Sequence, residues 1–329
     1  MSKKLLSINY LHIALISLSI GFFGCSNQVV NTSFTQTTRI TTNLPQVVAT
    51  TGVICDLTKQ IADNTINLIC LIPPDADPHL YRPKPEDRQA LEQAKLILYN
   101  GYNLEPGLIK IIQSTKNAAP KIAVGQVAVP QPQQFVENSR KVVDPHVWHD
   151  AKNAIKMVAV ISNNLGKLEP DNATTYSSNR KKITNELTQL ERWIKSRIAS
   201  IPTQRRKLVT THNALGYYAK AYNLSLAGKL AGINTEQKLT SARVKSLVQG
   251  IRKSQVPTIF AEVTISPNLI QSVARNAEVR ISKRKLYTDG IGEPGSEAES
   301  YQKMMVANTR TIVEGLGGTY LIFEPKAPQ

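Results

Sequence analysis

The strongest constraint on the fold is a long amphipathic helix pattern in the middle of the chain, flanked by two series of alternating strand and helix patterns. From Tyr176 to Ile198 apolar residues recur at helical spacing, and Pro170 and Pro202 flank the stretch. A helix of about 25 residues is near 40 Å long at 1.5 Å per residue. That is too long for an ordinary connection between neighbouring strands, so we expect it to run along two lobes and join them.

Both flanking series read as parallel strands separated by helices. The predicted strands are 46–54, 66–72, 95–101 and 120–126 before the long helix, and 206–212, 256–262 and 280–290 after it. The first series consists of apolar runs without polar alternation, which are typical of parallel strands covered by helices on both faces. The sequence therefore predicts an α/β fold of two parallel-sheet lobes joined by one long rigid helix.

The chain length agrees with two lobes, because 329 residues is about twice the usual length of a domain. We expect an N-terminal α/β lobe at 46–169, the linking helix at 170–201 and a C-terminal α/β lobe at 202–329. Residues 1–25 and 26–45 read as a signal segment and a polar tether, and they are left out of the fold.

The signal segment is similar to that of a bacterial lipoprotein. Lys3 and Lys4 give a positive start, and the apolar run at 13–23 is too short to read as a membrane span. Gly24 stands directly before Cys25, as at a lipoprotein processing site, and we expect lipidation of Cys25. Plain secretion with cleavage nearby is the alternative. Both readings place the protein outside the cytoplasm, in the periplasm or on the outer face of the membrane.

Export makes a disulfide between the two remaining cysteines feasible, because the compartment is oxidising. Cys55 lies just beyond the predicted strand 46–54, and Cys70 lies near the end of 66–72. If these strands are adjacent and parallel, both thiols lie at the same sheet edge. Two buried reduced thiols remain the alternative, since disulfide geometry cannot be read from spacing.

The formal net charge of +16 limits the possible partners. The basic residues form short scattered clusters, with no aromatic interleaving and no nucleic-acid motif. We therefore expect no nucleic-acid partner. A solvated basic surface, with or without a role toward an anionic membrane, is the preferred reading.

Polar residues at predicted strand ends carry the chemistry. The chain has only five histidines, yet Asp-Pro-His occurs twice, at 77–79 and 144–146. His79 and His146 follow predicted strands of the first lobe, and His212 and Asp289 lie at the ends of predicted strands of the second. Ligands of open α/β sheets bind just outside the carboxyl ends of strands. Imidazole and carboxylate are ligands of first-row metals, so the pattern predicts a metal site between the lobes.

Residues next to these ligands have two readings each. Asp77 and Asp144 could orient a ligand ring or simply cap a local turn. Each lies before a proline, which stiffens the backbone that carries the histidine. His149 and Asp150 could open the following helix at 151–165, with Asp150 as its cap.

At these residues the chain resembles the cluster A-I family of metal-binding lipoproteins, the substrate-binding components of ABC importers for zinc and manganese. The resemblance extends from about residue 46 onward. It is carried by the segments 75–91, DPHVWHD, 211–224, 258–262, 286–292 and 301–316. It implies two lobes bridged by one rigid helix, a metal in the cleft, and an ABC-type permease in the membrane as partner. We also expect a monomer.

The resemblance implies the ligands His79, His146, His212 and Asp289, with three departures from the family pattern. Asn213 replaces a frequent carboxylate, which leaves its supporting role in doubt. His149 replaces a usual apolar residue, and the long histidine-rich loop of zinc members is absent, its place being taken by 129–143.

The donor set favours Zn²⁺ over Mn²⁺. Manganese-type members of the family tend to carry glutamate at the position of His212, and carboxylates suit manganese whereas imidazoles suit zinc. We therefore expect zinc as the cargo, with manganese as the alternative.

A zinc-dependent hydrolase is an alternative function from a different class, an enzyme instead of a transport component. Glu262 would be its candidate general base. Catalytic zinc keeps one position open for water, whereas here a fourth protein ligand fills the shell and no HExxH motif occurs. We therefore expect no enzymatic activity and read Glu262 as a residue that supports a ligand or lies on the lobe surface. A surface adhesin is compatible with the same fold.

Overall fold

The computed structural model describes residues 44–74, 76–137, 139–229 and 241–326. The predicted signal segment and tether, including Cys25, lie outside the described residues apart from 44 and 45. Within the described ranges, no helix has the length and apolar character needed to cross a membrane.

The first sheet is parallel, with the strand order β2-β1-β3-β4. Val47 of the central strand pairs with Leu68 on one side and with Leu96 on the other. The elements of this region are β1 (Gln46–Ala49), α1 (Gly52–Ala62), β2 (Asn67–Cys70), α2 (Pro85–Gln93), β3 (Leu96–Tyr99), α3 (Pro106–Ser114), β4 (Lys121–Ala123) and α4 (Val124–Ala128). Parallel order and helical crossovers confirm the predicted α/β class.

Strand β1 ends earlier than the apolar run predicts. The run continues to residue 54, but Thr51 caps a helix by accepting a hydrogen bond at Oγ1 from the Ile54 N–H at 3.4 Å. The two faces of β1 pack into different clusters. Val47 and Ala49 share a core with α1, whereas Val48 packs with Leu91 and Leu108 of α2 and α3. The sheet is therefore covered on both faces, as expected.

A disulfide joins Cys55 in the first turn of α1 to Cys70 at the end of β2, with their Cα atoms 5.8 Å apart. Strands β1 and β2 are parallel neighbours, so both cysteines lie at one edge of the sheet.

A β-hairpin lies within 129–143, the segment that stands in place of the histidine-rich loop and for which the sequence predicted no strand. Strands β5 (Gln134–Glu137) and β6 (Arg140–Val143) pair antiparallel, with Phe135 opposite Val142. The hairpin leads directly into the second Asp-Pro-His segment.

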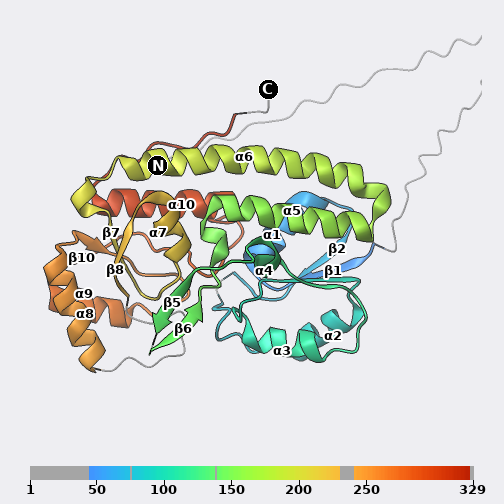
Figure 1. The fold of residues 1–329 in the computed structure, drawn as a ribbon, viewed down its shortest axis with the longest axis horizontal. Helices are drawn as coiled ribbons and strands as arrows, with labels where there is room; N and C mark the ends of the chain where they lie inside the picture. The colour runs from blue at the N-terminus through green and yellow to red at the C-terminus, as the bar shows by residue number, and fades with distance from the viewer. Residues whose placement is uncertain (1–43, 75, 138, 230–240, 327–329) are drawn as a thin grey trace, which may run out of the picture. The chain divides into compact units, whose positions relative to one another are not determined.

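The long predicted helix is α6 (Ala173–Ala199), a helix of 27 residues. Pro170 begins a short 3₁₀ turn instead of the helix itself. The predicted apolar face is buried: Tyr176, Ile183, Leu187, Leu190, Ile194 and Ile198. Helix α6 contacts α5 (Ala151–Leu168), α1, α7 (Gly216–Tyr222) and α10 (Tyr301–Leu316), so it joins the two halves of the fold (Figure 1).

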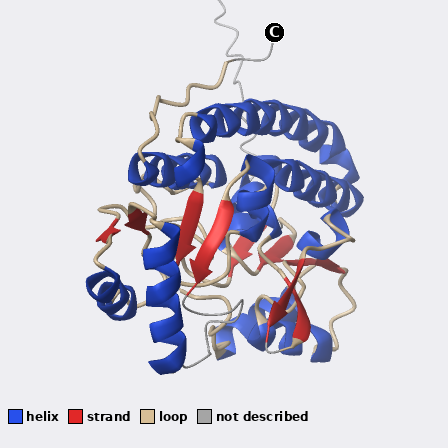
Figure 2. Ribbon diagram, turned by 60° about the vertical axis from the view of Figure 1, so that its left-hand side comes forward, coloured by secondary structure: helices blue, strands red, loops and turns tan. Residues whose placement is uncertain are grey.

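The second half has a smaller set of parallel strands. β7 (Lys207–Thr210) pairs with β8 (Ser225–Lys229), and β9 (Thr258–Ile259) pairs with β10 (Arg280–Ile281). A hydrogen bond of 3.0 Å from the Phe260 N–H to the Val209 carbonyl links β9 to β7. Helices α8 (Ser241–Ser254) and α9 (Asn268–Ala277) pack against these strands. Figure 2 shows helices around both sets of strands.

Candidate metal centre

Four side chains that the sequence singled out converge in one buried group. His79, His146, His212 and Asp289 each offer one ligand atom, and these atoms all lie within 4.8 Å of one another. Three of them follow the strands predicted to carry them, namely β2, β7 and β10. His146 follows the hairpin strand β6, so its position is set by an element that the sequence did not predict. All four are nevertheless brought together at the ends of strands.

The donor atoms point at one another across a gap that suits one ion. The Nε2 atoms of His79 and His146 are 3.1 Å apart. Asp289 Oδ1 lies 3.2 Å from His212 Nε2, 3.5 Å from His146 Nε2 and 3.7 Å from His79 Nε2. Within the described part of the chain, His212 Nε2 and Asp289 Oδ1 have no hydrogen-bond partner. Buried polar atoms without a partner are costly, and an ion bound between them would satisfy both.

The repeated Asp-Pro-His segments have one local geometry in common. Asp77 Oδ1 accepts a hydrogen bond from the His79 backbone N–H at 2.9 Å, and Asp144 Oδ1 accepts one from the His146 N–H at 3.0 Å. These are turns in which a short carboxylate satisfies the backbone two residues further on. The turn reading therefore holds for both aspartates.

Asp144 has a second role that orients a ligand ring. Its Oδ1 also accepts a hydrogen bond from His146 Nδ1 at 2.8 Å. A proton held on Nδ1 leaves the Nε2 lone pair free for an ion, so Asp144 fixes the tautomer that binds metal.

Glu262 does the same for His212, and it is fully buried rather than on the lobe surface. Its Oε1 accepts a hydrogen bond from the His212 backbone N–H at 2.9 Å, and its Oε2 accepts one from His212 Nδ1. Thr288 Oγ1 donates to the same Oε2 at 3.0 Å. With both oxygens engaged, Glu262 supports the ligand, and the surface reading was wrong.

Asn213 and His149 differ in what they contribute. Asn213 is buried, but its Nδ2 has no hydrogen-bond partner among the described residues, so no support of a ligand is seen. His149 is buried behind the site and donates from Nε2 to the Thr288 carbonyl at 2.8 Å. The sequence marked His149 as unusual but did not predict this bond. Asp150 caps α5 as expected, accepting from the Lys152 N–H at 2.9 Å.

Burial and neighbouring charges shift the pKa values of the group in different directions. Burial lowers the pKa of His79 to about 3, so this imidazole is neutral. Burial also opposes the charged forms of His146 and His212, but the carboxylates beside them outweigh it and raise both pKa values. Burial likewise acts against the Asp289 carboxylate, but the imidazoles around it hold its pKa well below its usual range. An arriving ion must therefore displace protons.

Fold and site together define a class: an α/β protein with a buried divalent-metal site of three imidazoles and one carboxylate at strand ends. A family model described as the periplasmic zinc-uptake complex component A matches residues 47–315. The chain belongs to this family. This family is the cluster A-I branch of metal-binding ABC substrate-binding proteins, which the sequence motifs also indicate. The family consists of transport components, so the hydrolase alternative is dropped and the chain is not an enzyme.

Individual relatives cover most of the chain. The manganese ABC transporter substrate-binding lipoprotein scaA of Streptococcus gordonii is 34% identical over 312 residues, which are 92% of this chain and 97% of that protein. The manganese lipoprotein PsaA of Streptococcus pneumoniae is 34% identical over 279 residues, 82% of this chain and 89% of that protein. The solved structure of the periplasmic zinc-binding protein TroA of Treponema pallidum has a TM-score of 0.79 and 30% identity, covering 83% and 99% of the two chains.

Proposed function

We propose that His79, His146, His212 and Asp289 capture one divalent transition-metal ion outside the cytoplasm for delivery to an ABC-type permease. The observation that carries this proposal is the convergence of three Nε2 atoms and one Oδ1 within 4.8 Å. Two of the rings are held from behind by carboxylates that leave Nε2 free. Such support orients the ligands before the ion arrives.

The comparisons favour manganese as the transported ion over the zinc expected from the sequence. Relatives whose names state the cargo, scaA and PsaA, are manganese proteins, whereas the solved relative TroA is described as zinc-binding. We propose manganese as the cargo, in line with these names. Zinc is the second candidate, because three imidazoles and the general affinity order both favour it over manganese at equilibrium.

We also propose that the protein is held at the membrane by lipid on Cys25 and acts as a monomer. Relatives described as lipoproteins cover 92% and 82% of the chain, which supports export and anchoring. The proposed lobes are 46–169 and 202–329, with 170–201 as their link. Replacing Cys25 by serine is expected to move the protein from the membrane fraction to the soluble fraction.

The proposal is tested by equilibrium titration of the metal-stripped protein with Mn²⁺ and with Zn²⁺. We expect one bound ion per chain, and we expect Asp289→Asn to weaken both affinities by at least about tenfold, because it removes the charged ligand oxygen. Asp150→Asn is the matched control, since Asp150 caps α5 and is not one of the four ligands. Equal effects of the two substitutions would refute the assigned site.

A further inference from the structure

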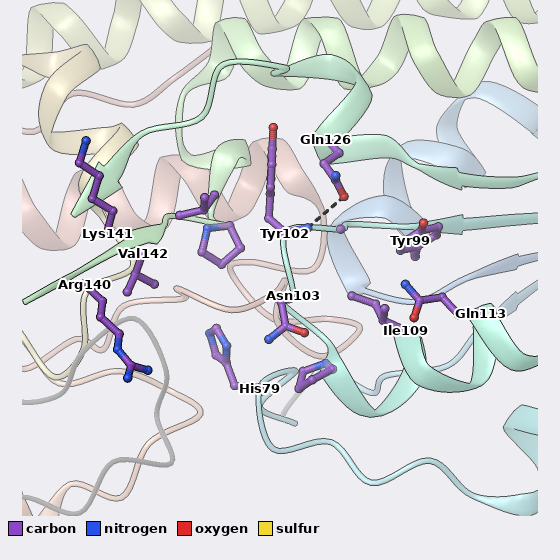
Figure 3. A pocket seen from close by; sticks show the side chains of 14 residues that line it. His79, Tyr99, Tyr102, Asn103, Ile109, Gln113, Gln126, Arg140, Lys141 and Val142 are labelled. Carbon is purple, nitrogen blue, oxygen red and sulfur yellow. Dashed lines mark hydrogen bonds between the residues drawn. The ribbon is translucent and has the colours of Figure 1, made fainter. Parts of the chain in front are cut away.

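A cavity of about 640 Å³ opens beside the metal centre and reaches one of its four ligands, His79. Its walls come from the segment after β3, helix α3, Gln126 of α4 and strand β6 (Figure 3). The other three ligands do not line it. His79 is 5% exposed, whereas His146 and His212 are fully buried and Asp289 is 3% exposed. Solvent therefore approaches the group from the His79 side.

The cavity has the size and lining that a hydrated cation needs. Six waters at roughly 30 Å³ each take up roughly 200 Å³, so a hydrated ion fits. Tyr102, Asn103, Gln113 and Gln126 offer neutral polar groups that can exchange hydrogen bonds with the waters of the ion. No carboxylate belongs to the described lining, so no competing group would trap the ion short of His79.

Two basic side chains lie on strand β6 at the wall of this cavity. Arg140 and Lys141 are exposed, and neither forms an ion pair with a described residue. Positive charge along an approach path repels an incoming cation and lowers its association rate, to an extent that depends on salt. The same residues belong to the basic excess of the sequence, for which the metal site itself gives no reason.

We propose that the metal ion enters and leaves through this cavity, meets His79 first, and is slowed there by the charges of Arg140 and Lys141. The proposal rests on the proposed metal capture and adds its route and rate. Positive charge at the opening of the cavity slows the capture of the ion. This charge does not form part of the group of side chains that binds the ion. The charges of Arg140 and Lys141 therefore change the association and dissociation rate constants of the ion, while the contacts that hold the bound ion stay the same.

The effect of Arg140 and Lys141 is tested by stopped-flow association of Mn²⁺ and Zn²⁺ with the full-length protein. Trp148 supplies the signal, because its ring lies 5.4 Å from the His146 ring. We expect Arg140→Glu with Lys141→Glu to raise the association rate about three- to tenfold at low salt. We also expect the rate to increase with salt in the unaltered protein and to decrease with salt in the variant.

The matched control is Lys181→Glu with Lys182→Glu on the exposed face of α6, which gives the same total charge away from the cavity. If both pairs change the rate and its salt dependence equally, net charge explains the effect and the proposed route is overturned. If the Arg140 and Lys141 pair has no effect, the charge barrier is likewise refuted.

A plug of the cavity tests the route without changing charge. Val142 lines the cavity from strand β6, and Val142→Trp is expected to slow association and dissociation by the same factor and to leave the equilibrium affinity within about twofold (Figure 3). Unchanged rates at unchanged affinity would refute the route. Absence of binding in the unaltered protein would instead refute the proposed function, so the two failures are distinguishable.

Discussion

Glu262 holds His212 at two points, accepting hydrogen bonds from its backbone N–H at 2.9 Å and from its ring Nδ1. The two residues come from different strand ends, β9 and β7, and both are fully buried. The bond to the ring sets the tautomer, and the bond to the backbone sets the height of the ligand at the strand end. In the proposed metal capture, Glu262 therefore acts through His212, because its hydrogen bonds go to His212 and Thr288.

We predict that Glu262→Gln weakens metal affinity by about 10- to 100-fold, since a neutral amide is a poorer acceptor for the ring N–H. Isothermal titration of the stripped protein with Zn²⁺ gives the affinity. Glu297→Gln is the control, because exposed Glu297 pairs with Arg284 and is not one of the four candidate ligands. Affinities that agree within twofold for both variants would show that the bond is not needed for binding.

Metal affinity is predicted to fall as pH falls from 8 to 5.5. The pKa values of His146 and His212 are raised, so protons compete with the ion at these rings already above the ordinary imidazole value of about 6.5. Each protonated ligand weakens binding about tenfold per pH unit below its pKa. Dissociation constants measured at pH 8, 7 and 6 test this, and a flat profile would contradict the histidine ligands.

His149 is predicted to make the metal-free protein sensitive to acid. Burial lowers its pKa to about 3, so the unfolded chain binds a proton below pH 6.5 that the folded chain does not. Stability is therefore full above pH 6.5 and is lost as pH falls toward 3. Relative to His149→Leu, the free energy of unfolding should drop by about 2 kcal/mol between pH 7.5 and 5. Parallel pH profiles from urea unfolding would contradict this.

Glu105 is predicted to have the opposite pH dependence. Burial raises its pKa to about 7, although Thr50 and the Asn100 N–H donate hydrogen bonds to its Oε1 at 2.9 and 2.6 Å. A raised pKa gives stability that is full below pH 4.5 and is lost as pH rises through 7. Between pH 4.5 and 8 the unaltered protein should lose about 3 kcal/mol relative to Glu105→Gln. Glu92→Gln on the exposed face of α2 is the control, and equal profiles for the two variants would refute the prediction.

The sequence predicts the centre well because the donors are rare residues at strand ends. Strand patterns in the sequence place β2, β7 and β10, and the residues after these strands bring His79, His212 and Asp289 together. The helix period predicts the buried face of α6, since a 3.6-residue repeat over 27 residues leaves little ambiguity. The length of this predicted helix also indicates that it joins two separate sets of strands.

Other features depend on contacts that no local pattern contains. The polar hairpin β5–β6 carries no strong apolar alternation, so its pairing escaped prediction, although it positions His146. The burial of Glu262 follows from its bonds to His212 and Thr288, which lie 50 and 26 residues away along the chain. The donor set led to the expectation of zinc, but the same donors accept both zinc and manganese, so the sequence does not decide the transported ion.

Competition between Zn²⁺ and Mn²⁺ for the stripped protein, with and without His212→Glu, is the sharpest test of the assigned metal centre. We predict that both ions bind one shared site, that zinc binds more tightly, and that the substitution shifts the preference toward manganese by at least about tenfold, because a carboxylate replaces an imidazole. If His212→Glu leaves both affinities unchanged, the ion is held elsewhere and the assignment of this centre is wrong.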